Sequence, residues 1–224
     1  MTIGEIWRAC EGNVLAFLVL LPSKIGLAVI TPGNAAAIVR QRIPIDPGDI
    51  PRHAMKAISN HVSHLKDAGY ELIHYSETPL LEETRELFSA LMLSADGVTG
   101  AGVLYMKEPH KVISAATLVT RCSDGSYIGT TSEPRLFNMP THFHFQHFVG
   151  MPANRLHDRH QERLHEAELH GMRFHKYTPQ TVAKDSLRFI HDLGNHLIAR
   201  GVFVEIPDEE VEDIFWRRGD THDD

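Results

Sequence analysis

The sequence has few cysteines and no surplus of positive charge. Only Cys10 and Cys122 occur, far apart and outside any CxxC pair. Neither a disulfide framework nor a cysteine-ligated zinc site is therefore expected. Asp and Glu number 29 against 22 Lys and Arg, which gives a formal net charge of −7. This balance argues against a nucleic-acid partner, because binding to phosphates needs a field of positive charge.

Complete catalytic fingerprints are also absent from the sequence. It contains no Gly-x-Ser-x-Gly elbow, no phosphate loop and no dinucleotide-binding glycine pattern. No organic cofactor is therefore predicted. A chain of 224 residues with 42% hydrophobic and 23% charged residues is nevertheless long and apolar enough to fold. These observations favour a non-catalytic binding or interaction module of unknown ligand over an enzyme.

The most hydrophobic stretch lies near the N-terminus. Residues 14–30 read VLAFLVLLPSKIGLAVI, and a run of about 17 residues is the shortest that crosses a ~30 Å hydrocarbon core. Lys24 and Pro22 subtract much of the insertion energy that the apolar residues supply. The segment before the run carries two acids beside Arg8, unlike the basic start of a cleaved signal peptide. We therefore expect an uncleaved, single-pass membrane anchor.

A membrane anchor at residues 14–30 would also orient the rest of the chain. Arg40 and Arg42 follow the run and only Arg8 precedes it, which favours a body on the cytoplasmic side. A membrane lipid or a membrane protein is then the expected partner. The alternative is a soluble cytoplasmic protein in which the same run forms two buried strands joined by a turn at residues 22–24.

The sequence divides into three parts. Residues 1–48 hold the apolar segment and a connector rich in Pro and Gly, residues 49–207 form a globular domain, and residues 208–224 are an acidic tail. In the tail, eight acids stand against two arginines. Such a tail is a solvated end or docks on the body or a partner through Ile214, Phe215 and Trp216.

The globular part is predicted to be an α+β domain. Five extended segments separated by short turns predict an antiparallel meander, since short turns join antiparallel neighbours. These segments are residues 70–76, 87–94, 102–107, 112–121 and 126–131. Helical spacing of apolar residues and capping signals predict helices over residues 51–68, 152–170 and 178–200. We expect these helices to cover the sheet.

Histidine is the residue present in excess. Sixteen histidines occur, and eight of them fall within one 34-residue window. Alternation along the segment THFHFQHFV puts His142 and His144 on one face of a strand, and His157 and His160 lie one turn apart on the following helix. These four side chains predict a site for zinc or a similar divalent metal. The alternative function is therefore a metal-binding protein or a metal-dependent hydrolase, with Glu162 acting on a bound water.

The same segments have other interpretations. THFHFQHFV is similar over fewer than ten residues to the signature of the histidine-triad nucleotide transferases and hydrolases, but Gln146 moves His147 to the other face of the strand. His160 falls in the apolar stripe of its helix, which is typical of a core histidine with a hydrogen-bond partner. A third interpretation is a proton sensor, because protonation of all the histidines would reverse the sign of the net charge.

Overall fold

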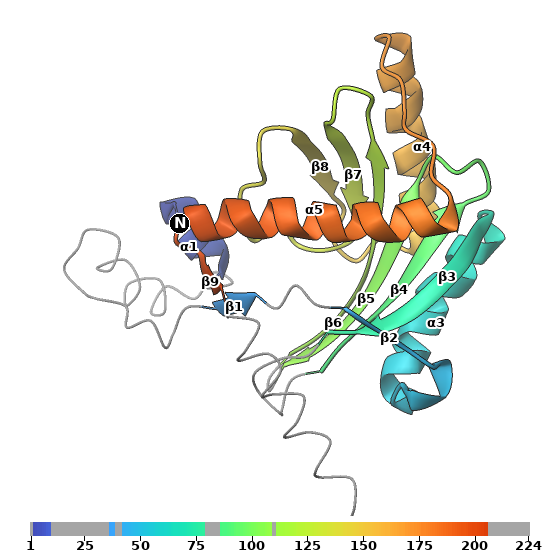
Figure 1. Cartoon of the computed structure of the whole chain (residues 1–224). Helices are drawn as coiled ribbons and strands as arrows, with labels where there is room; N and C mark the ends of the chain where they lie inside the picture. Colours follow the sequence, from blue (N-terminus) through green and yellow to red (C-terminus); the bar gives the residue numbers. More distant parts are fainter. Residues whose placement is uncertain (1, 10–35, 39–41, 79–85, 109–110, 206–224) are drawn as a thin grey trace, which may run out of the picture.

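The computed structural model describes residues 2–9, 36–38, 42–78, 86–108 and 111–205. Its main feature is a seven-stranded sheet of order β2-β3-β4-β5-β6-β7-β8, in which every neighbouring pair except β7–β8 is antiparallel (Figure 1). The strands are β2 Ile43–Ile45, β3 Tyr70–Glu77, β4 Glu86–Ser94, β5 Gly100–Glu108, β6 Lys111–Arg121, β7 Tyr127–Thr131 and β8 Phe143–His147. The predicted α+β fold with an antiparallel sheet is confirmed.

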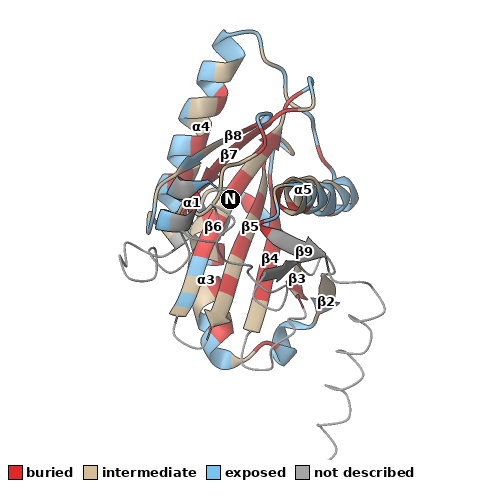
Figure 2. Ribbon diagram, turned by 90° about the vertical axis from the view of Figure 1, so that its left-hand side faces the viewer, coloured by how far each residue is buried: buried red, intermediate tan, exposed pale blue. Residues whose placement is uncertain are grey.

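Helices cover both faces of this sheet. Helices α3 (Arg52–Asp67) and α4 (Ala153–Leu169) lie on one face, and α5 (Pro179–Ala199) crosses the opposite face (Figure 2). The apolar residues that recur at helical spacing in α3, namely Ala54, Ile58, Val62 and Leu65, are buried in the larger core cluster. All three predicted helices are therefore present, and α5 provides a second cover on the far side of the sheet.

The helix ends follow from local chemistry. Thr178 caps α5, because its side chain accepts a hydrogen bond from the Thr181 amide while the Thr181 hydroxyl accepts one from the Thr178 amide. Gly69 and Gly171, which follow α3 and α4, have φ angles of 86° and 82°. This left-handed backbone is open to glycine at little cost, so the chain leaves both helices there.

Four short elements complete the described fold. They are α1 (Ile3–Ala9), β1 (Ala36–Ile38), the 3-10 helix η2 (Pro47–Asp49) and β9 (Phe203–Glu205). Strands β1 and β9 pair in parallel as a separate two-stranded sheet. Helix α1 and the β1–β9 pair lie close together near the end of α5 (Figure 1).

The last strand of the sheet departs from a simple meander. β8 pairs in parallel with β7, so that Tyr127 is opposite Phe143 and Thr131 is opposite His147. A parallel neighbour requires the chain to return to the start of β7, and residues 132–142 make that return. Pro134 and Pro140 in this segment have no amide hydrogen for a strand ladder. This connection carries residues that line the candidate site described below.

Two predicted segments lie outside the described residues. They are the apolar run 14–30 and the acidic tail 208–224. Among the residues that the structure does describe, no helix is both long and apolar enough to cross a membrane.

Gly129 in β7 gives a test of packing beneath α5. A Cβ atom at this position would clash with ring atoms of Phe145, and Phe145 stacks on Phe143 and Phe189. The substitution Gly129→Ala should therefore displace the ring and cost about 1 to 3 kcal/mol of unfolding free energy, measured by urea denaturation. Gly102→Ala is the matched control, because a Cβ there meets nothing within 4 Å. Equal midpoints for the two variants would contradict this prediction.

Candidate functional site

Strand β6 extends beyond its neighbour β7 and leaves an edge. β7 pairs only with the second half of β6, from Thr117 to Arg121, whereas β5 pairs with β6 from Lys111 to Val119. At Ala116, the next residue of β6 toward its start, the hydrogen-bond partner is Ser132, which follows β7. The Ala116 backbone N–H donates to the Ser132 hydroxyl and the Ser132 backbone N–H donates to the Ala116 carbonyl, both at 2.9 Å. Within the described part of the chain, residues 111–115 have no strand partner on that side.

The backbone groups that face this edge follow from the register. Antiparallel ladders alternate, so the residues that bond in the direction of β7 are those an even number of positions from Ala116. These residues are Ser114 and Val112.

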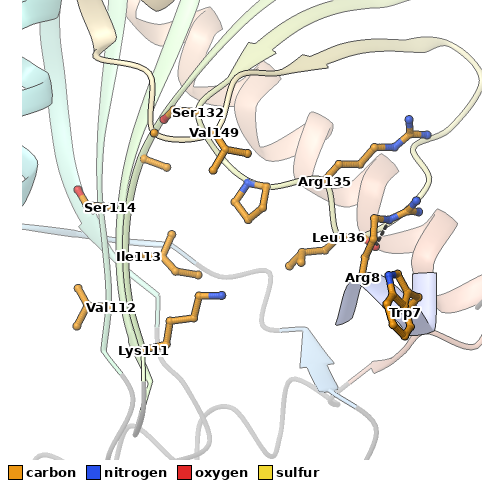
Figure 3. A pocket seen from close by; sticks show the side chains of 13 residues that line it. Trp7, Arg8, Lys111, Val112, Ile113, Ser114, Ser132, Arg135, Leu136 and Val149 are labelled. Atoms are coloured by element: carbon orange, nitrogen blue, oxygen red, sulfur yellow. Dashed lines mark hydrogen bonds between the residues drawn. The ribbon is translucent and has the colours of Figure 1, made fainter. Parts of the chain in front are cut away.

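A groove of about 610 Å³ lies along this edge (Figure 3). We call it the edge groove. Lys111 and Ile113 project from β6 toward the side on which Leu136, Arg8 and Trp7 lie (Figure 3). The groove is lined by residues from α1, β6, the segment after β7 and the segment after β8, namely Trp7, Arg8, Lys111, Val112, Ile113, Ser114, Ala115, Ser132, Pro134, Arg135, Leu136, Val149 and Gly150.

Exposed apolar side chains gather at this groove. The described residues include five large apolar side chains that are exposed, and three of them, Trp7, Val112 and Val149, line the edge groove. Their exposed fractions are 43%, 60% and 70%. Single exposed apolar residues are ordinary, but a cluster around a concave surface is typical of a binding site.

The groove also carries positive charge. Arg8, Lys111 and Arg135 line it, and no acidic residue is among the described residues that do so. This local charge is opposite to the net charge of −7 of the whole chain. A ligand with acidic groups next to apolar ones would therefore match the groove better than a basic ligand.

Asn138 holds the wall of the groove against the body. Its side-chain oxygen accepts a hydrogen bond from Arg8 at 3.1 Å, and its backbone N–H donates to the Glu5 carboxylate at 2.7 Å. Arg200 at the end of α5 binds both carboxylate oxygens of Glu5 at 2.6 Å and also donates to the Asn138 carbonyl. The helix that carries Trp7 is thus fixed by one buried carboxylate and one loop residue.

A second group of polar side chains lies on the sheet face that α5 crosses. Burial raises the pKa of Glu133, although the Thr117 hydroxyl donates to its carboxylate and Arg42 attracts it. Burial likewise lowers the pKa of Arg42 and of His147. The His147 ring bonds the Glu133 carbonyl through Nδ1, and its buried Nε2 has no hydrogen-bond partner. These groups are polar and desolvated, but nothing in their arrangement identifies a ligand.

His160 is a core residue held by two threonines. Its side chain is fully buried, and its Nδ1 and Nε2 atoms hydrogen-bond with the hydroxyls of Thr130 at 2.9 Å and Thr120 at 3.1 Å. Burial lowers the pKa of His160 to about 3, and the nearby Arg163 and His157 contribute to the shift. Both ring nitrogens are therefore occupied, and the ring is neutral at physiological pH.

The other three predicted ligands have different surroundings. His142 and His144 are exposed at the start of β8, while Nδ1 of His157 lies 3.2 Å from the Tyr70 hydroxyl. In the described part of the chain, no group of three or more His, Cys, Asp or Glu side chains could hold a metal ion. For these four histidines to bind one ion, the His160 nitrogen that ligates it would have to give up its threonine contact. The metal site stays a prediction, which metal analysis of the purified protein would check.

No family model, curated protein or solved structure matches this chain. The fold class is that of an α+β domain with an open, mostly antiparallel sheet and three helices packed on it. Its function has to be inferred from the edge groove itself.

The sequence did not predict the edge groove. Its lining comes from four segments that are up to 143 positions apart, from Trp7 to Gly150. Val112 and Val149 look like ordinary core residues in the sequence, and only the early end of β7 leaves Val112 uncovered. The one available signal was the pair of prolines after β7, which predicts that strand pairing stops near residue 131.

Proposed function

We propose that this chain is a membrane-attached binding module that holds an extended, acidic peptide segment in the edge groove. The observation that carries this proposal is the strand edge of β6, which lies among exposed apolar and cationic side chains. A peptide that pairs with this edge continues the sheet in place of β7. The absence of complete catalytic motifs supports binding rather than catalysis.

The geometry suggests how such a peptide is recognised. Its backbone pairs with Ser114 and Val112, and these hydrogen bonds supply affinity that does not depend on sequence. Alternate side chains of a strand point to opposite sides, so one set contacts Val112 and the other contacts Ile113 and Trp7. Acidic residues on the peptide lie near Arg8, Lys111 and Arg135, which selects against basic peptides.

Fluorescence anisotropy with synthetic peptides tests this function. The probe is a fluorescein-labelled peptide of about nine residues that alternates Val and Asp, compared with the same peptide carrying Lys for Asp. We expect the acidic peptide to bind the full chain at least about ten-fold more tightly than the basic one. N-methylation of alternate peptide amides should abolish binding in one register and spare it in the other, because only one set of amides faces β6.

Val112→Asp provides the loss-of-binding variant. Val112 is 60% exposed, so the change should leave folding intact while it repels the acidic peptide and weakens binding at least about ten-fold. Leu169→Asp on α4 is the matched control, because Leu169 is 74% exposed and lies outside the edge groove. The proposal fails if the two variants bind the acidic peptide as the parent chain does, or if no register of N-methylation matters.

Membrane attachment is tested separately by alkaline extraction. If residues 14–30 anchor the chain, the untagged full-length protein should stay in the membrane pellet after a carbonate wash. Replacing Leu18 and Leu20 with Asp should release it, since each charge near the middle of a span adds about 3 kcal/mol to the cost of insertion. Release of the parent protein by carbonate would overturn membrane attachment and leave the peptide-binding proposal unaffected.

A further inference from the structure

We infer that the acidic tail of this chain, residues 208–224, is the segment that occupies the edge groove when no other peptide is bound. This inference rests on the proposed function, because it requires that the groove accept an extended acidic segment. The tail then competes with external peptides for the edge groove. An external peptide then has to displace the tail before it binds.

The tail starts near the wall of the groove. β9 ends at Glu205, five residues after Arg200, and Arg200 binds Glu5 on α1. The same helix carries Trp7 and Arg8, which line the edge groove. Ile214 is nine residues beyond Glu205, and nine extended residues span up to about 30 Å. Because Arg200 contacts α1, the chain that leads into the tail passes beside a helix that lines the groove.

The composition of the tail matches the groove. Five acids stand within residues 208–213, directly before Ile214, Phe215 and Trp216. Three cationic side chains, no described acidic residue, and exposed apolar side chains on both sides of the strand edge line the groove. Ile, Phe and Trp are also good strand formers, as pairing with an edge strand requires. Charge, apolar content and strand preference thus all point to the same segment of the chain.

The two tryptophans of the chain make the test direct. They are Trp7 in the groove and Trp216 in the tail, so Trp216→Phe leaves Trp7 as the only tryptophan and keeps the tail aromatic. The comparison chain replaces Ile214, Phe215 and Trp216 with serine, and Trp7 is again the only tryptophan. If the tail covers the groove, the serine chain should show a red-shifted Trp7 emission and an acrylamide quenching constant at least about two-fold higher.

Peptide binding separates this inference from the proposed function. We expect the Val-Asp peptide to bind the serine chain at least about five-fold more tightly than the Trp216→Phe chain, and Val112→Asp to weaken both. Equal quenching and equal binding in the two chains would overturn the tail inference while the edge groove still binds peptide. Absence of peptide binding in both chains would overturn the proposed function as well.

The tail could also occupy the edge groove of a second copy of the chain. The dependence of Trp7 quenching on protein concentration distinguishes this arrangement from occupation within one chain. Occupation within one chain predicts that Trp7 quenching is independent of protein concentration, because the tail and groove are tethered. Quenching that falls with rising concentration over about a hundred-fold range would indicate exchange between copies and would overturn the intramolecular arrangement.

Discussion

Replacing His160 with alanine should lower the free energy of unfolding by about 2 to 4 kcal/mol. The imidazole is fully buried and bridges Thr120 in β6 and Thr130 in β7. Its loss leaves a cavity between α4 and the sheet. It also removes one hydrogen-bond partner from each of two buried hydroxyls, although Thr120 keeps Thr99 and Thr130 keeps Arg163.

Urea denaturation measures this loss, and an exposed histidine provides the control. His165 lies on the same helix five residues further on and is exposed, so His165→Ala should change stability by no more than about 0.5 kcal/mol. If His160→Ala unfolds at the same urea concentration as His165→Ala, the bridge has no energetic role.

The buried imidazole also predicts a dependence of stability on pH. Its pKa is about 3 in the folded state and about 6.5 in the unfolded chain. The unfolded state therefore binds the proton more readily than the folded state. The contribution of His160 to the free energy of unfolding is complete above pH 6.5, and it is lost as the pH falls from 6.5 toward 3, by up to about 1.4 kcal/mol per pH unit. His160→Gln keeps two hydrogen-bonding atoms and does not titrate. The difference in unfolding free energy between parent and His160→Gln should shrink or reverse over this pH range, and a constant difference would contradict the assignment.

The surroundings of His160 are only partly predictable from the sequence. Helical spacing predicts that its ring lies in the apolar stripe of α4, because the period of a helix is a local property. The same spacing says nothing of Thr120 and Thr130, which are 40 and 30 positions away and meet His160 only after β6 and β7 have paired. The metal hypothesis arose from this missing information, since an imidazole with unknown partners is a candidate ligand.

The strands and the groove also differ in whether neighbouring or distant residues determine them. The hairpin turns at Asp96-Gly97 and Asp124-Gly125 are read from neighbouring residues, and their glycines have φ angles of 71° and 88°. The parallel placement of β8 depends instead on a return segment without strand signals. The edge groove is the space left where β7 ends and this return segment leaves the sheet. The prolines after β7 indicate only where strand pairing stops, and no local pattern predicts which residues line the groove.

Glu5→Gln is expected to have the second large effect, a loss of about 3 kcal/mol together with release of α1. The Glu5 side chain has no exposed surface, and Arg200 binds both of its oxygens. Burial alone would raise the pKa of Glu5, but hydrogen bonds from Arg200, Asn138 and Thr2 outweigh it and hold the pKa far below its usual range. Because the folded-state pKa is depressed, the stability that the charged Glu5 carboxylate supplies is present above the unfolded pKa near 4.5 and is lost as the pH falls.

An exposed ion pair separates this effect from the mere loss of a charge. Arg159 and Glu162 bond at 2.7 Å on the surface of α4, with 53% and 62% of their side chains exposed. Glu162→Gln should therefore cost no more than about 0.5 kcal/mol in the same urea experiment. In a Trp216→Phe background, Glu5→Gln should also increase the quenching of Trp7, since α1 carries that side chain into the edge groove. A stable Glu5→Gln protein with unchanged Trp7 quenching would mean that α1 is held by other contacts, and the wall of the groove would then not depend on the Glu5–Arg200 pair.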